Sequence, residues 1–151
     1  MKKVTFAMLA ILAWGACSAF GQSGAEIDAL LGTKELSVAL AARFVLPAAD
    51  VLPATATPEA AFASATEKGW LPAGTLPDTP VRLSQLSYLI MQSFGLRGGA
   101  MYSLAPGPRY AYRELLYRRV IQGVSDPGQT VNGERLLRML GRILDQQGGE
   151  S

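Results

Sequence analysis

Apolar residues recur at helical spacing in three stretches of this chain. In the first stretch they stand at Leu36, Ala39, Leu40 and Phe44, offsets that share one face of an α-helix. The same offsets recur in two later stretches, and the pattern predicts helices near 33–46, 82–94 and 132–146. Because β-branched residues are sparse, we expect an all-α fold.

The three stretches are related by a constant shift of 50 residues without a gap, which indicates an internal repeat. The aligned apolar positions are Leu31, Val81 and Val131; Leu36, Leu86 and Leu136; Ala39, Leu89 and Met139; Leu40, Ile90 and Leu140; and Phe44, Phe94 and Leu144. Chance is the alternative, since amphipathic helices share leucine patterns. The ungapped register over three copies favours a true repeat, whose aligned positions should pack into one interior.

The stretches between these helices match at the same shift and predict a second type of helix, near 58–68 and 109–121. The aligned pairs are Ala61 and Ala111, Ala65 and Leu115, Trp70 and Val120, and Leu71 and Ile121. Each second-type helix leads into a turn rich in glycine and proline. The sequence therefore predicts a pseudo-repeated helical bundle of three core helices and two connecting helices.

Two linkers rich in proline and glycine or alanine, residues 47–58 and 95–108, separate the repeat units. Both are short for domain boundaries, so we expect one domain. The predicted organisation is a leader over 1–21, a helical domain over 22–146 and a disordered tail over 147–151.

The first 21 residues have the pattern of an export signal. A basic start at Lys2 and Lys3 precedes an uncharged, almost wholly apolar run, and Ala19-Phe20-Gly21 fits the small-x-small rule for cleavage before Gln22. The apolar run is shorter than the ~20 residues of a membrane-spanning helix. An uncleaved anchor or a buried helix is the alternative. We expect an exported protein of the periplasm or the cell surface.

Cys17 offers a second way of processing the leader. Gly15-Ala16-Cys17 is similar to the end of a bacterial lipobox, although Trp14 stands where that motif has leucine. Lipidation of Cys17 therefore remains the alternative to cleavage after Gly21, and the protein would attach to a membrane only in that case. A single cysteine excludes an internal disulfide.

Composition excludes several kinds of catalytic centre. The chain has no histidine, so catalytic triads and two-histidine metal sites are excluded. Gly98-Gly99 is not part of a phosphate loop, and Asp126 beside Ser125 is too little for a calcium site. We expect no enzyme activity, metal or cofactor, and a hydrolase built on two carboxylates stays the remote alternative.

Loss of Lys2 and Lys3 with the leader would leave as many basic as acidic residues, but they are unevenly distributed. Every basic residue after position 95 is an arginine, which gives a mildly basic surface and not a nucleic-acid-binding tract.

Arginine and tyrosine interleave between residues 109 and 119. Tyr110, Arg113 and Tyr117 share one helical face, and Arg109 lies beside them. Aromatic faces stack on sugar rings or apolar surfaces, and arginine binds carboxylates and phosphates. The alternative is a tyrosine-rich packing face with solvated arginines.

Trp70 follows Gly69 at a predicted turn. It is either a ligand platform or a core plug between helices, and the apolar Val120 at the equivalent place favours the plug.

The repeat unit resembles the S-layer homology repeat, in which a helix leads to a G-[hydrophobic]-x-D-G turn and then to a helix opened by I-T-R-A-E-F. Residues 111–121, 123–128 and 131–136 follow that order, and residues 81–86 and 31–36 resemble the opening in the other copies. The resemblance implies a central three-helix bundle and binding of cell-wall polysaccharide through the arginine and glutamate of the opening.

This chain departs from the family at those two positions. Only Glu35 keeps the acidic residue in register, because Gln85 replaces it in the second copy and Glu134 lies one place early in the third. The arginine position holds Thr33, Leu83 and Gly133.

We therefore expect a non-catalytic exported protein of the cell envelope that binds or anchors to cell-wall polymer. The alternative is a structural or assembly protein that binds another envelope protein through its helical faces. The candidate ligand-binding residues are Arg109, Tyr110, Arg113, Tyr117, Glu35 and Trp70.

Overall fold

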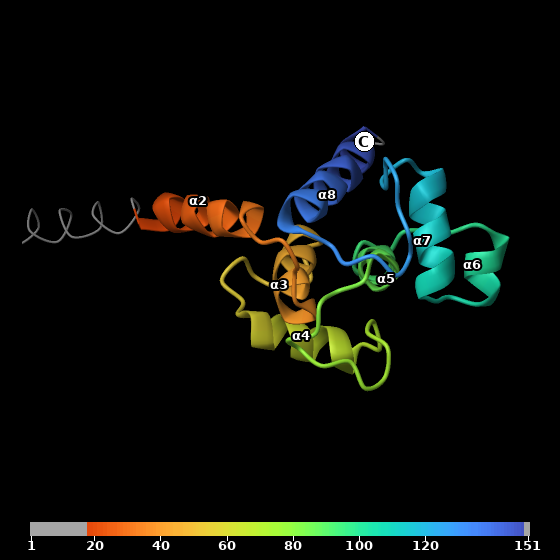
Figure 1. The fold of residues 1–151 in the computed structure, drawn as a ribbon, viewed down its shortest axis with the longest axis horizontal. Coiled ribbons are helices and arrows are strands. Elements are labelled where there is room, and N and C mark those ends of the chain that lie inside the picture. The colour runs from red at the N-terminus through yellow and green to blue at the C-terminus, as the bar shows by residue number, and fades with distance from the viewer. Residues whose placement is uncertain (1–17, 150–151) are drawn as a thin grey trace, which may run out of the picture.

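The computed structural model describes residues 18–149, with side chains from residue 24 onward, and this part of the chain is all-α (Figure 1). Its seven helices are α2 (Ser18–Leu31), α3 (Val38–Ala48), α4 (Pro58–Glu67), α5 (Leu83–Ser93), α6 (Ala100–Leu104), α7 (Pro108–Tyr117) and α8 (Gly133–Gly148). Most of the predicted leader, including Cys17, lies outside the described residues. No strand occurs between residues 18 and 149, only isolated β-bridges.

Helices α4, α5, α7 and α8 confirm four predicted helices, with ends that differ by up to four residues. Their starts follow the local sequence: Thr57 and Asn132 accept N-cap hydrogen bonds at 3.2 and 2.8 Å, and Pro58 and Pro108 open α4 and α7. The prediction missed α2 and α6, and α8 continues two residues beyond its predicted end.

Four helices end in the same way. Asp50, Gly69, Gly95 and Arg119, which follow α3, α4, α5 and α7, all have positive φ between 56° and 69°. In each case the next residue donates its N–H to the carbonyl five residues earlier, at 2.9 Å. This is the Schellman arrangement, and the residue that closes it is apolar: Val51, Trp70, Leu96 and Val120.

These helix ends correct the predicted repeat in its first copy. Helices α4 and α7 are 50 residues apart, as are α5 and α8, but Asp50 and Gly95 are 45 apart. The reason is that the segment carrying α6 makes the α5–α7 connection five residues longer than the α3–α4 connection. An ungapped alignment that fits α4 to α7 therefore misplaces α3.

The corrected register changes which residues form the first apolar face. Val38, Ala41 and Val45 are fully buried and correspond to Leu83, Leu86 and Ile90. The predicted equivalence of Leu31 is wrong, because its side chain is 48% exposed. Leu36 is buried like Leu86 and Leu136, but it precedes its helix instead of lying within it.

The three segments that precede α3, α5 and α8 meet in a ring of backbone hydrogen bonds. Leu36 donates its N–H to Val131 O at 2.8 Å, Val81 donates to Leu36 O at 2.8 Å, and Val131 donates to Val81 O at 3.2 Å. All three side chains are buried. The ring therefore holds the starts of the three helices together in the core.

Each of these segments also satisfies the first amides of another helix. Pro77 and Thr79 accept hydrogen bonds from the start of α3, and Pro127 and Gln129 accept from the start of α5. Thr33 accepts from Gly133 at the start of α8, at 3.0 Å. These hydrogen bonds pair N–H groups that are otherwise left without partners at a helix N-terminus. Because each unit's preceding segment serves the helix of another unit, the three units are linked in a closed cycle.

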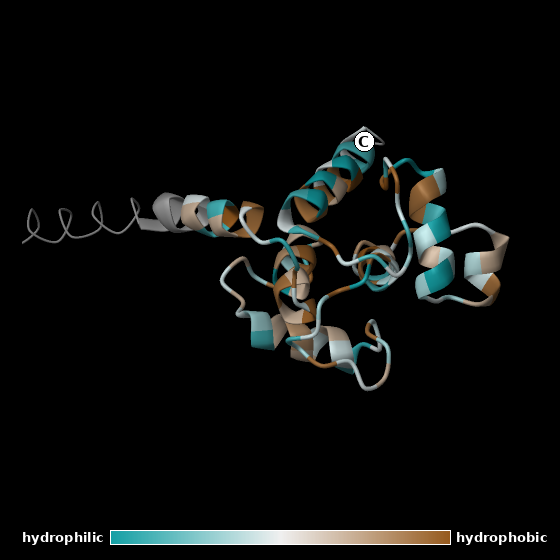
Figure 2. Cartoon of the chain, in the orientation of Figure 1, coloured by the Kyte–Doolittle hydropathy of each residue, from teal (hydrophilic) through white to brown (hydrophobic). Residues whose placement is uncertain are grey.

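The remaining helices pack around this centre. Helix α4 packs on α3, α7 on α5, and the C-terminal end of α2 contacts α8, while α2 points away from the rest (Figure 1). The side of α8 seen in Figure 2 is largely hydrophilic. None of the helices within the described range is long and apolar enough to cross a membrane.

The contact between α2 and α8 depends on a glycine. An ideal Cβ on Gly133 would lie 1.7 Å from the backbone oxygen of Leu30, whereas one on Gly141, in the same helix, would meet no atom within 4 Å. Only a residue without a side chain allows this approach.

We expect Gly133→Ala to lower the free energy of unfolding by about 1–3 kcal/mol, because the backbones of α2 and α8 must separate. The matched control is Gly141→Ala, which should raise it by up to about 1 kcal/mol through helix propensity. Urea unfolding followed by circular dichroism measures both. A Gly133→Ala variant as stable as the parent protein would contradict the close contact.

Candidate functional site

Two of the predicted ligand-binding residues line one hollow. Tyr110 and Arg113 of α7 line a cavity of ≈ 270 Å³ between α6 and α7. We call it the α6–α7 hollow; its other lining residues are Gly99, Ala100, Met101, Tyr102 and Glu114. Arg109 and Tyr117 are exposed on the same helix but do not line it, and the Tyr117 side chain is 86% exposed.

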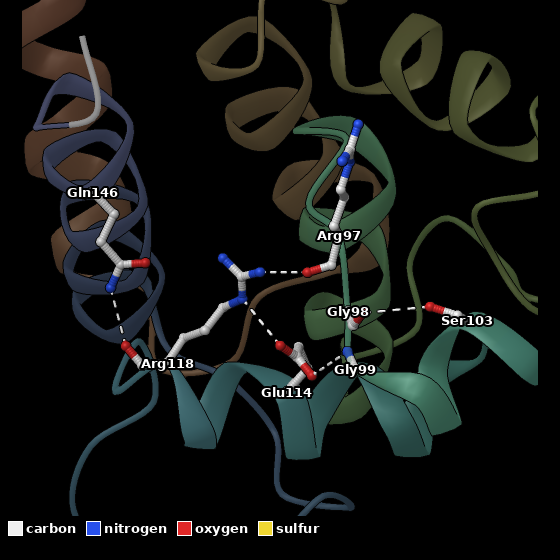
Figure 3. A network of polar contacts seen from close by, with 7 residues as sticks. All are labelled: Arg97, Gly98, Gly99, Ser103, Glu114, Arg118 and Gln146. Carbon is white, nitrogen blue, oxygen red and sulfur yellow. Dashed lines mark hydrogen bonds and ion pairs between the residues drawn. The ribbon is translucent and has the colours of Figure 1, made fainter.

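A polar network fixes the loop that forms one wall of the α6–α7 hollow. Glu114 points between Gly99 and Arg118 (Figure 3), accepting the Gly99 N–H at 3.0 Å and the Arg118 Nε–H at 3.2 Å. Arg118 also donates to the Arg97 carbonyl, and Gln146 of α8 donates to the Arg118 carbonyl at 3.0 Å. The network ties the loop before α6 to both α7 and α8, so the hollow has a preformed wall.

Tyr102 lines the α6–α7 hollow beneath the loop of residues 97–99. Its ring is buried, and its hydroxyl accepts a hydrogen bond from Gln92 Nε2 at 2.8 Å. Burial raises the pKa of Tyr102 above its usual value, as do the nearby Tyr88 and Glu114, while the Gln92 hydrogen bond opposes the shift. A Cβ on Gly98 would lie 2.5 Å from the Tyr102 ring, so the loop turns over this ring at a glycine.

The tyrosines near α7 divide into two groups. Tyr102 and Tyr112 are buried and bonded through their hydroxyls, Tyr112 to the Ser125 carbonyl at 3.1 Å. Both rings therefore pack against the core. Tyr110 is half-buried beside the exposed Arg113, which leaves an aromatic ring and a guanidinium together at the surface. That pair can stack on a sugar ring and bind an anionic group.

Trp70 and Glu35 lie apart from the α6–α7 hollow, on other elements. Trp70 is half-buried at the end of α4 and packs against the core, with Lys68 Nζ 5.3 Å from its ring centroid. Its place agrees with the core-plug interpretation. Glu35 is exposed and accepts a hydrogen bond from Thr130 Oγ1 at 3.2 Å, which joins the segments before α3 and α8.

A second hollow, which the sequence did not predict, lies between α8 and residues 120–124. It has a volume of ≈ 330 Å³, and Arg135, Arg138 and Arg142 line it. The signal for it was present in the i, i+3, i+7 spacing of these arginines. We call it the arginine hollow.

Between residues 18 and 149 no group of three or more histidine, cysteine, aspartate or glutamate side chains is arranged to hold a metal ion. Comparison of the chain with models of protein families, with curated proteins and with solved structures finds no match.

We expect Tyr102→Phe to lose about 1 kcal/mol of stability near neutral pH, because Gln92 loses its partner. Since the pKa of Tyr102 is raised in the folded protein, the stability it contributes is complete below its unfolded pKa of about 10 and is lost as the pH rises through the folded value. The difference between parent and variant should therefore shrink above about pH 10.

Urea unfolding at several pH values measures this difference. Tyr117→Phe, at an exposed ring, is the matched control and should unfold like the parent protein throughout. A Tyr102→Phe deficit that stays constant up to about pH 11 would contradict the assignment.

Proposed function

We propose that this protein is a non-catalytic, exported protein of the cell envelope that binds cell-wall polymer. The observation that carries the proposal is the closed hydrogen-bonded cycle of Leu36, Val81 and Val131, which relates three helix units around one centre. On this proposal the fold is a divergent S-layer homology arrangement, with α3, α5 and α8 as core helices and α4 and α7 as connecting helices.

The α6–α7 hollow is the proposed polymer-binding surface. Tyr110 supplies a half-buried ring and Arg113 an exposed guanidinium, on a wall that Glu114 and Arg118 hold in place. A preformed site loses little conformational entropy on binding, which favours affinity for a flexible polymer. Glycans with acidic groups match both side chains.

The arginine and glutamate through which the S-layer homology family binds polysaccharide are not kept in this chain. In the corrected register the arginine position of the opening holds Val38, Leu83 and Gly133, and Gly133 is required by the approach of Leu30. The acidic position then holds Leu40, Gln85 and Arg135, so the predicted equivalence of Glu35 is wrong. Polymer binding would therefore use the third unit's surface instead of the openings of the three units.

A second candidate function is binding of another envelope protein through helical faces. Its support is the exposure of apolar side chains on two helices: Met101 and Leu104 of α6 are 56% and 81% exposed, and Tyr117 of α7 is 86% exposed. Apolar side chains at the surface can anchor a partner protein.

Retention on purified peptidoglycan sacculi separates the two functions. Arg113→Ala and Tyr110→Ala should each weaken retention about tenfold, as expected for loss of roughly 1.4 kcal/mol of binding free energy. Arg97→Ala is the matched control, because it removes an exposed arginine that does not line the hollow. Retention that neither variant changes would contradict the assigned surface.

The second function makes a different prediction. Leu104→Ser and Tyr117→Ala should then abolish retention on a membrane-protein fraction, and no retention on sacculi should occur.

Processing of the leader is tested by mass spectrometry of the exported protein. We expect an N-terminus at Gln22, which follows the small-x-small sequence. An acylated N-terminus at Cys17 would contradict cleavage after Gly21 and would place the protein on a membrane.

A further inference from the structure

The arginine hollow concentrates positive charge without acidic residues in its lining. Arg135, Arg138 and Arg142 stand at i, i+3 and i+7 on α8, so their side chains share one helical face. None of the described residues that line the hollow is acidic. Like charges at this spacing destabilise a helix slightly, so a counter-charge in the hollow would be favourable.

Within the part of the chain that the structure describes, only one of the three arginines has a carboxylate partner. Arg138 pairs with Glu134 at 3.2 Å, and both side chains are 57% exposed. Such an exposed pair contributes little, and it leaves the Arg138 guanidinium open to other anions. With Glu134 included, the group carries a net charge of about +2 at neutral pH.

The other two guanidinium groups are held in place by the protein. Gln129 Oε1 accepts from Arg135 Nη1 at 3.1 Å, and the Val120 carbonyl accepts from Arg142 Nη1 at 2.9 Å. Nη2 of Arg135 is buried and has no hydrogen-bond partner among the described residues. A buried donor without a partner is costly, so the Arg135 guanidinium is not fully satisfied by the protein groups around it.

The repeat shows that the scaffold does not require these arginines. At the equivalent places α5 has Gln85, Tyr88 and Gln92, and the larger Trp70 stands where the third unit has Val120. The charged hollow is thus particular to the third unit, where a small side chain accompanies three arginines.

We infer that the arginine hollow binds the phosphate monoester group of a ligand about the size of a sugar phosphate. A phosphate monoester carries about −1.5 to −2 charges at neutral pH, which matches the charge of the site. Its three oxygens accept the paired hydrogen bonds that guanidinium groups donate. A volume of ≈ 330 Å³ is at the lower end of small-ligand sites. This site is separate from the α6–α7 hollow and does not depend on polymer binding there.

Isothermal titration calorimetry of the exported protein with glucose 1-phosphate, inorganic phosphate and glucuronate, at matched ionic strength, tests the inference. We expect saturable binding of both phosphates, and at least about tenfold weaker binding of the monoanionic glucuronate. Arg135→Gln and Arg142→Gln, which introduce the residues of the second unit, should each weaken phosphate binding about tenfold or more.

Two further variants keep the test decisive. Arg97→Gln removes one positive charge outside the hollow and should leave binding unchanged. Arg138 is exposed, and among the described residues its ion-pair partner is the equally exposed Glu134. Arg138→Gln should therefore fold normally and still weaken binding, even if a substitution at Arg142 disturbs the Val120 contact.

Non-saturating titrations, or equal binding in all four variants, would overturn the inference. Glucuronate binding as tight as glucose 1-phosphate would overturn the assignment to phosphate. Retention on sacculi is measured separately, so failure of the polymer-binding proposal and failure of this site give different results.

Discussion

The ring of backbone hydrogen bonds between Leu36, Val81 and Val131 is the constraint on which this fold depends. Each residue donates one hydrogen bond and accepts one within the ring, at a place where the side chains are buried. A buried N–H or carbonyl without a partner costs about 1–3 kcal/mol, so loss of one segment would leave groups in the other two unsatisfied. The ring gives three helical units the mutual dependence that strands obtain from a sheet, and the starts of α3, α5 and α8 follow from it.

Helical periodicity predicted four helices well, but it could not fix the register of the first. Residues 36–46 are almost wholly apolar, with Arg43 as the one charged residue, so several registers place apolar side chains on one face. The five additional residues around α6 carry no strong helical pattern of their own. The structure resolves the register through the helix ends, where Asp50 adopts the conformation that Gly95 has 45 residues later.

The candidate sites show the same limit of sequence information. The spacing along α7 predicted that Tyr110 and Arg113 lie close together, and both line the α6–α7 hollow. The spacing also placed Tyr117 on that face, but the lining of the α6–α7 hollow ends at Glu114. The arginine hollow depends on how residues 120–124 lie against α8, which is a tertiary contact that no local pattern encodes. Glu35 and Trp70 are separated from α7 for the same reason.

Comparison of equivalent arginines explains why binding is assigned to the third unit. Arg43 of α3 occupies the place of Arg138 in the corrected register, yet it is only 13% exposed and pairs with Glu26 of α2 at 3.2 Å. Its guanidinium also lies 5.7 Å from the Phe44 ring centroid. In the first unit this arginine therefore binds α2 through Glu26, and the second unit has Tyr88 at the equivalent position. In the third unit Arg138 stays exposed between two anchored arginines. The equivalent position therefore serves packing in two units and carries an exposed guanidinium in the third, which is the group that the proposed phosphate site uses.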